Sequence, residues 1–200
     1  MRVFGKRAVL NLSHAPSEIA AVTNRQIEAI FPRVDHFIQG NEKRLLDFGC
    51  RPGRFMPALL SRTSGLVIGT DPVYSLLARA PVHARASYVQ LGEESVPVAS
   101  GSIDLVFVRL VLGGIADDRL RFTAREIERV LKTDGVLILI ENTTNARSSA
   151  HWAFRSVEAY QDLFSSIGLS CAGEYTDVNE RISIMAGRSY HPSGAGEGVE

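Results

Sequence analysis

The sequence has little cysteine, no excess of charge and no long apolar run, and each absence excludes a class of protein. Its two cysteines, Cys50 and Cys171, form neither a CxxC pair nor another metal-ligand spacing. We therefore expect free thiols in a reducing compartment and no metal site. The 22 basic and 22 acidic residues balance to zero, so nothing in the overall charge attracts the chain to nucleic acid or to an anionic membrane.

Membrane and export signals are also missing from the sequence. No apolar stretch approaches the about 18 residues that a membrane span needs. The basic residues near Met1 are not followed by the apolar run of a signal peptide. We therefore expect a cytoplasmic protein with no membrane partner. The sequence carries no indication of oligomeric state.

Apolar runs alternate with amphipathic segments over most of the 200 residues, a length typical of one domain. The patterns predict helices over 18–38, 54–61, 72–79 and 120–131, and a further helix capped by Ser156. They predict strands over 43–48, 66–70, 87–91, 103–108 and 136–140, and a terminal hairpin over 169–175 and 181–186. The hairpin connection is too short for a helical crossover, so this pair should be antiparallel.

This order of elements predicts the fold class. We expect a single-domain α/β protein with a Rossmann-like doubly wound sheet, mostly parallel, with an antiparallel C-terminal hairpin strand. We divide the chain into an N-terminal helical cap segment (1–42), a core domain (43–188) and a flexible tail (189–200).

The most informative segment is Leu45–Phe55, in which an apolar run ends in Asp47 and continues into a turn containing Gly49 and Gly53. A second acid, Asp71, closes the next apolar run. Two strand-end acids about one βα unit apart suit a nucleoside-type cofactor, with one acid at the turn and the other at a ribose. The structural alternatives are a helix N-terminal charge for Asp47 and a simple N-cap for Asp71.

Three segments together resemble one family, the class I S-adenosylmethionine-dependent methyltransferases. Residues 46–54 (LDFGCRPGR) are similar to the family's acid-x-Gly-x-Gly-x-Gly turn. Residues 103–107 (IDLVF) and 128–137 (ERVLKTDGVL) are similar to its fourth strand and to its approach to the fifth. The resemblance covers residues 43–188. It departs at Arg51, which replaces the middle glycine of the turn.

The resemblance implies S-adenosylmethionine as cofactor and a role for individual residues. Asp47 would hold the methionine ammonium group, Asp71 would accept hydrogen bonds from the ribose hydroxyls, and the turn glycines would allow close backbone approach. The residues that it places at the cofactor are Asp47, Gly49, Cys50, Gly53, Asp71, Pro72, Glu93, Glu94, Arg109 and Leu110.

Several of these positions have alternative interpretations. Glu93 and Glu94 can be aligned in two ways with the family's adenine-binding acid, and a solvated loop is the other interpretation. Arg109 either holds an acidic acceptor group or forms a structural ion pair. His151 is the candidate general base, against a surface histidine. Trp152, Phe154 and Tyr160 form either an acceptor wall or helix packing.

The resemblance implies a methyltransferase that acts on an O, N or C nucleophile of a small molecule, with no nucleic-acid partner. The alternative is a non-catalytic, methyltransferase-like binding or regulatory module, which the cation at Arg51 favours. A nicotinamide-dependent oxidoreductase is disfavoured, because the dinucleotide turn needs glycine at its third and sixth positions. Counted from Gly49, those positions are Arg51 and Arg54.

Overall fold

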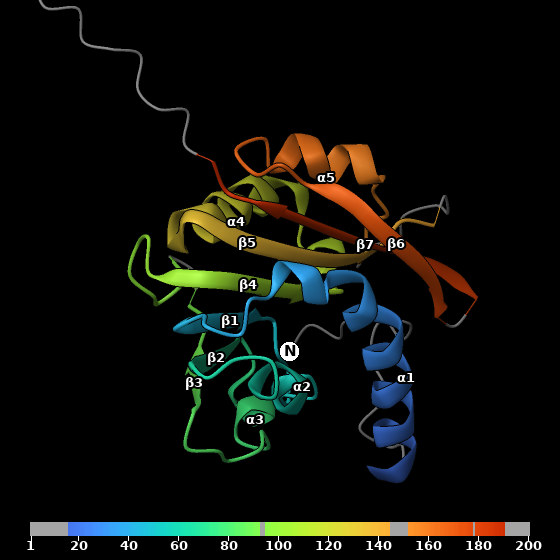
Figure 1. Cartoon of the computed structure of the whole chain (residues 1–200). Coiled ribbons are helices and arrows are strands. Elements are labelled where there is room, and N and C mark those ends of the chain that lie inside the picture. The colour runs from blue at the N-terminus through green and yellow to red at the C-terminus, as the bar shows by residue number, and fades with distance from the viewer. Residues whose placement is uncertain (1–15, 93–94, 145–151, 178, 191–200) are drawn as a thin grey trace, which may run out of the picture.

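The computed structural model describes residues 16–92, 95–144, 152–177 and 179–190. One seven-stranded sheet runs through the molecule in the order β3-β2-β1-β4-β5-β7-β6 (Figure 1). The strands are β1 (Arg44–Phe48), β2 (Leu66–Asp71), β3 (Ala86–Gln90), β4 (Ile103–Arg109), β5 (Leu131–Asn142), β6 (Ser170–Asp177) and β7 (Glu180–Arg188). Strands β1 to β5 pair in parallel, and β7 is antiparallel to both β5 and β6. This confirms the predicted fold class.

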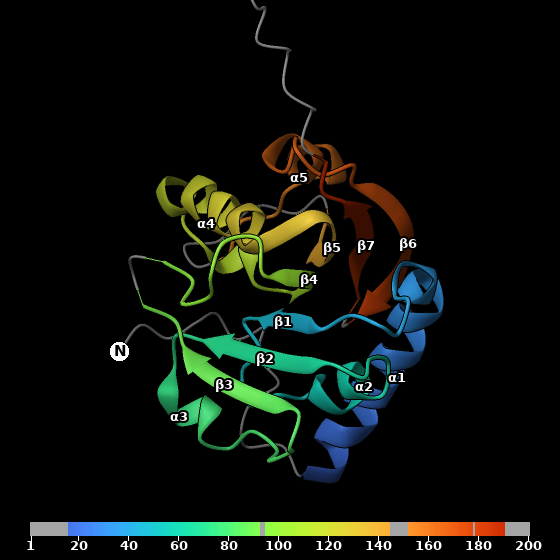
Figure 2. The same ribbon diagram turned by 60° about the vertical axis from the view of Figure 1, so that its left-hand side comes forward.

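Helices cover both faces of the sheet (Figure 2). They are α1 (Pro16–Val34), α2 (Met56–Leu60), α3 (Tyr74–Leu77), α4 (Asp117–Val130) and α5 (Val157–Leu163), with short 3-10 helices η1 (Asp35–Phe37) and η2 (Leu112–Gly114). Side chains of α1 and α2 pack around Phe107 on one face, and those of α4 and α5 pack around Val106 on the other. Neighbouring residues of β4 thus point into separate cores, as expected for a strand buried on both faces.

The helix caps and boundaries follow the sequence with one clear exception. Ser156 caps α5 as predicted, since its Oγ accepts a hydrogen bond from the N–H of Ala159 at 3.2 Å. Helix α4 stops at Val130, one residue before its predicted end, but β5 starts well before the strand predicted over 136–140. Leu131 is buried and already pairs with β4, so β5 begins there and accommodates 133–135 as an irregularity in its register, with Asp134 at a φ of +62°.

The strand order places a crevice at one edge of the sheet. From β1 the chain continues outward through β2 and β3, whereas from β4 it continues in the opposite direction to β5. The connections that follow β1 and β4 therefore diverge at the carboxyl ends of these two neighbouring strands. Ligands of open α/β sheets bind at such a reversal point.

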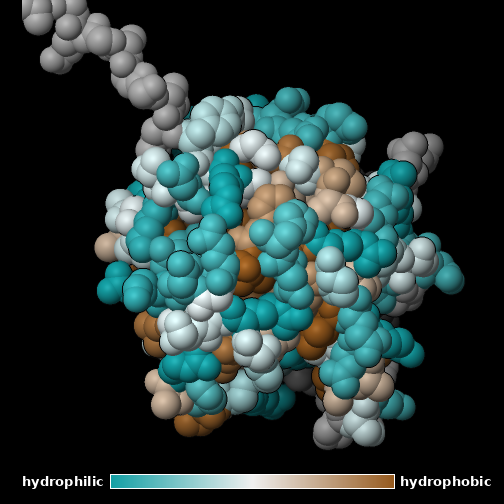
Figure 3. Space-filling view, in the orientation of Figure 1, coloured by the Kyte–Doolittle hydropathy of each residue, from teal (hydrophilic) through white to brown (hydrophobic). Residues whose placement is uncertain are grey.

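On the face of the molecule that Figure 3 shows, hydrophobic residues form small separate groups among hydrophilic ones. The large hydrophobic side chains that are exposed in the described part of the chain are Tyr74, Val82, Phe122 and Tyr190. Within the same residues, every helix is too short or too polar to cross a membrane.

Candidate functional site

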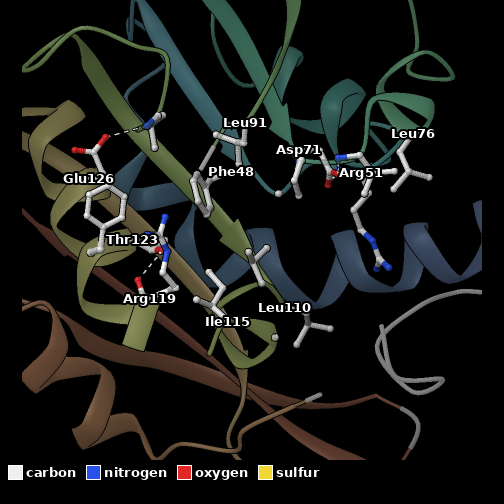
Figure 4. Close-up of a pocket in the computed structure, with 18 of the residues that line it drawn as sticks. Phe48, Arg51, Asp71, Leu76, Leu91, Leu110, Ile115, Arg119, Thr123 and Glu126 are labelled. Atoms are coloured by element: carbon white, nitrogen blue, oxygen red, sulfur yellow. Dashed lines mark hydrogen bonds between the residues drawn. The ribbon is translucent and has the colours of Figure 1, made fainter. Parts of the chain in front are cut away.

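A cavity of about 320 Å³ lies at the carboxyl ends of β1, β2 and β4 (Figure 4). Its walls come from the β1 turn, the residues after β2 and β3, the segment after β4, the first turns of α4, and Trp152. Of the predicted cofactor residues, the cavity is lined by Gly49, Asp71, Pro72 and Leu110. These four residues lie at or just after the carboxyl ends of β1, β2 and β4, so strand pairing brings them to one cavity.

Hydrogen bonds join the turn after β1 to the end of β2. The N–H groups of Gly49 and Cys50 donate to the Thr70 carbonyl at 2.8 and 2.9 Å. Gly49, Arg51 and Gly53 have φ values of +76°, +56° and +68°. The left-handed conformation costs an L residue about 1–2 kcal/mol, so Arg51 adopts the backbone shape of the glycine that it replaces at some energetic cost. Position 51 therefore has a backbone conformation that glycine would adopt without this cost.

The Asp71 carboxylate connects this turn with the start of the segment after β2. Its Oδ2 accepts from the N–H of Arg51 at 3.0 Å, and its Oδ1 accepts from the N–H of Val73 at 2.9 Å. Burial raises its pKa, whereas these two hydrogen bonds and the Arg51 charge lower it. Each carboxylate oxygen has a second lone pair, so Asp71 can still accept from two hydroxyl groups of a ligand in the cavity.

Asp47 lies in β1, just before the turn, and is 4% exposed. Its Oδ2 has no hydrogen-bond partner in the described part of the protein. Burial, and secondarily the charge of Asp71, raise the pKa of Asp47 to about 7, against the opposing effect of Arg54 and Arg109. A buried acceptor without a partner is costly, so this carboxylate is suited to a cationic donor such as an ammonium group.

Arg109 and Leu110, which were predicted together, lie in different surroundings. Leu110 has a φ of +51° and lines the cavity. Arg109 is buried on the α1 side of the sheet, where its Nη2 donates to Asp177 Oδ2 at 3.2 Å and to Tyr175 Oη at 3.3 Å. Its guanidinium also stacks over the Phe55 ring at 5.2 Å. Of the two interpretations given above, the structure contains the ion pair.

Other predicted residues support the turn or lie outside the described residues. Cys50 is buried, and burial raises the pKa of its thiol. A Cβ on Gly53 would lie 3.1 Å from Pro81 Cδ and 3.2 Å from Tyr88 Oη, so this glycine allows close packing away from the cavity. Glu93, Glu94 and His151 fall outside the described residues.

Two interpretations were open for Trp152 and Tyr160, and Glu141 was not predicted as a site residue. Trp152 lines the cavity, whereas Tyr160 is fully buried in the core. Glu141 ends the apolar run of β5, is fully buried, and binds the backbone after β4. The one signal in the sequence was an acid at the end of an apolar run, as at Asp47 and Asp71.

The chain matches known methyltransferases in sequence and in structure. Residues 46–139 match a family described as a methyltransferase domain. The uncharacterized methyltransferase sll0829 of Synechocystis sp. is 29% identical over 100 residues, which are 50% of this chain and 47% of that protein. A malonyl-[acyl-carrier protein] O-methyltransferase of Legionella pneumophila is 27% identical over 171 residues, which are 83% of this chain and 54% of that protein. The chain thus spans about half the length of the curated relatives that it matches.

A crystal structure of an S-adenosylmethionine-dependent methyltransferase from Aquifex aeolicus has the same fold, with a TM-score of 0.65. It is 16% identical, and the match covers 88% of this chain and 99% of that one. The family match over residues 46–139 and this shared fold support a class I S-adenosylmethionine-dependent methyltransferase, with S-adenosylmethionine as its cofactor.

Proposed function

We propose that this chain binds S-adenosylmethionine in the cavity and transfers its methyl group to an O, N or C nucleophile of a small molecule. The observation that carries the proposal is the pair of carboxylates, Asp47 and Asp71, on either side of the Gly49 turn. One has an unpartnered buried oxygen, and the other has free lone pairs at the cavity. These properties fit a ligand that carries both an ammonium group and a vicinal diol.

Each residue of the site then has a definite part in binding. Asp47 would hold the ammonium group of the methionine end, directly or through water, and Asp71 would accept from both ribose hydroxyls. Gly49 would let the ligand approach the turn backbone. The apolar side chains of Leu91, Val111 and Ile115 line the same cavity and would contact the adenine ring.

The bound cofactor supplies a methyl group activated by a sulfonium. The contribution of the chain is to hold this group and the acceptor at reacting distance, which can account for several kcal/mol of the barrier. An acceptor that is already ionised needs no base. For an acceptor that keeps its proton, His151 remains our candidate general base.

The acceptor is proposed from the apolar character of the cavity and from the names of the relatives. Among the described lining residues, the charged side chains are Arg51, Asp71, Arg119 and Glu126, and the others are mostly apolar. The name of the Legionella relative specifies a malonyl group on a carrier protein, which presents a carboxylate. A small carboxylic acid, free or carried by a protein, is therefore the first acceptor to test.

The proposal is tested by incubating the protein with S-adenosylmethionine labelled in its methyl group and a cell extract separated by size. We expect label in the small-molecule fraction, together with S-adenosylhomocysteine. Label in the macromolecular fraction alone would overturn a free small-molecule acceptor and leave the carrier-bound acid, for which malonyl-carrier protein would then be tested directly. Cofactor binding without label in either fraction would instead support the non-catalytic module.

A further inference from the structure

The cavity wall that follows β4 is held by hydrogen bonds from other elements of the fold. Residues 111–115, here called the wall segment, contribute Val111, Gly114 and Ile115 to the cavity lining. The segment contains two consecutive glycines, which have little conformational preference of their own. Its position must therefore be fixed by contacts with other parts of the chain.

Glu141 binds the amide side of the wall segment. Its Oε1 accepts from the N–H of Val111 at 2.8 Å and from that of Leu112 at 2.7 Å, and the N–H of Gly113 also faces the carboxylate. The side chain is fully buried at the end of β5. Its Oε2 has no hydrogen-bond partner among the described residues. Among the described residues, the hydrogen-bond donors to Glu141 are therefore all in the wall segment.

Arg155 binds the carbonyl side of the same segment. Its Nη1 donates to the Leu112 carbonyl at 3.1 Å, and its Nη2 donates to the Ile115 carbonyl at 3.4 Å and to Asp117 Oδ1 at 2.5 Å. The N–H of Ala153 donates to the Gly113 carbonyl at 2.8 Å. The segment is thus held by buried or half-buried groups on both sides.

The wall segment in turn contacts the two other parts of the site. A Cβ on Gly113 would overlap the Trp152 ring, and a Cβ on Gly49 would overlap Cγ2 of Val111. The segment is therefore packed between Trp152 and the turn after β1. Any shift of its backbone would change the distance between these two walls, because neither contact leaves free space.

We propose that Glu141 is a positioning residue that fixes the wall segment between the β1 turn and Trp152, and thereby sets the width of the cavity. This inference rests on the proposed function for its consequence, which is cofactor binding. The geometry of the wall segment itself does not depend on that function.

A buried carboxylate is an expensive way to bind three amides, since ionising it inside the protein is opposed by burial. Burial raises the pKa of Glu141 to about 7, although the hydrogen bonds from Val111, Leu112 and Gly113 and the Arg155 charge lower it. The buried Tyr160 hydroxyl from α5 lies close to both Glu141 and Arg155. Burial of the Glu141 carboxylate costs free energy, and its hydrogen bonds go to the wall segment. This combination indicates that the position of the wall segment is important.

The test uses Trp152, the single tryptophan of the chain, as a reporter of the wall. Acrylamide quenching of its fluorescence is measured in the absence of ligand, well below the unfolding midpoint determined by circular dichroism. We expect Glu141→Ala to raise the quenching constant at least twofold. Glu141→Gln retains an oxygen acceptor and should stay within twofold of the wild type. Tyr160→Phe, which removes the neighbouring hydroxyl, is the matched control and should leave the quenching unchanged.

The same variants are then titrated with S-adenosylhomocysteine. We expect the affinity to fall at least tenfold in Glu141→Ala and to be restored to within about twofold in Glu141→Gln. Wild-type quenching and affinity in Glu141→Ala would overturn the inference and leave Glu141 a role in stability alone. If Glu141→Ala does not fold, Arg155→Met removes the carbonyl-side contacts instead, and unchanged Trp152 quenching in that variant would be equally contrary.

The two proposals can fail separately. If wild-type protein does not bind S-adenosylhomocysteine, the proposed function fails, but the quenching measurements still decide whether Glu141 positions the wall segment.

Discussion

Val111 fills the space that a side chain at position 49 would need. A Cβ built on Gly49 would overlap Cγ2 of Val111 and lie 3.1 Å from its Cγ1, and Gly49 has a φ of +76°. The turn after β1 and the segment after β4 are thus fitted to each other at the cavity. The absence of a side chain at Gly49 serves this packing in addition to any approach by a ligand.

Gly49→Ala should therefore destabilise the protein through two separate effects. The left-handed backbone costs about 1–2 kcal/mol and the overlap with Val111 about 1–3 kcal/mol. Adding Val111→Ala should recover the second cost and leave the first. Urea unfolding of the two single variants and the double variant measures the coupling. Additive effects of the two substitutions would contradict this account of the contact.

Two substitutions of Arg51 separate the effect of its backbone conformation on stability from the effect of its side chain. Because its φ is +56°, Arg51→Gly should be more stable than Arg51→Ala by about 1 kcal/mol, after allowing for the greater flexibility of unfolded glycine. The same pair at Arg54, whose φ is not positive, is the control and should give the opposite order. The free energies of unfolding in urea provide the comparison. An Arg51→Ala variant at least as stable as Arg51→Gly would show that the left-handed conformation carries no strain.

Cofactor affinity should depend on pH through Asp47. The pKa of this carboxyl is raised to about 7, and an ammonium group would bind its ionised form. Affinity for S-adenosylhomocysteine should therefore rise with pH, by up to tenfold per unit below about pH 7, and then level off. Asp47→Asn should bind weakly with a flat profile. Calorimetric titrations from pH 5.5 to 8 test this, and an equal slope in wild type and variant would exclude Asp47 as the titrating group.

The stability of the protein should change with pH in the opposite direction. Burial raises the pKa of both Asp47 and Glu141 to about 7, so the folded state retains their protons more strongly than the unfolded state. Their contribution is fully present below about pH 4 and is lost as the pH rises through 7. At about 1.4 kcal/mol per pKa unit, each can contribute a few kcal/mol at most.

The free energy of unfolding of the wild type should therefore decrease between pH 5 and 8, and less steeply in Asp47→Asn and in Glu141→Gln. Asp104 and Glu126, whose pKa values are lowered by Lys132 and Arg129, act in the other sense only at more acidic pH. Denaturant midpoints across this range measure the effect. A wild-type stability that is constant or rises from pH 5 to 8 would disprove it.

The placement of the two strand-end acids at one edge of the sheet could be predicted from the sequence. Asp47 and Asp71 each end an apolar run, and parallel strands bring such ends to one edge of the sheet. The positive φ at Arg51 also agrees with the glycine expected there.

The remaining part depends on which side chains meet after the strands have paired. Arg109 could not be assigned to its ion pair without knowing that β6 passes near the end of β4, on the α1 side. Glu141 could not be recognised as a backbone ligand, because its partners follow a different strand about 30 residues earlier. The strand predicted over 136–140 was too short, because Leu131 already pairs with Ile103 and β5 begins there.

The most direct test of the central claim is calorimetric titration of the protein with S-adenosylmethionine and S-adenosylhomocysteine. Asp71→Ala is compared with Asp104→Asn, since Asp104 also accepts from two backbone N–H groups, at 2.9 and 2.8 Å, but on the opposite edge of the sheet. We predict micromolar binding by wild type and Asp104→Asn, and a loss of about 10- to 100-fold in Asp71→Ala, as expected for charged hydrogen bonds. No binding by the wild type, or equal binding by Asp71→Ala, would contradict a cofactor site at this cavity.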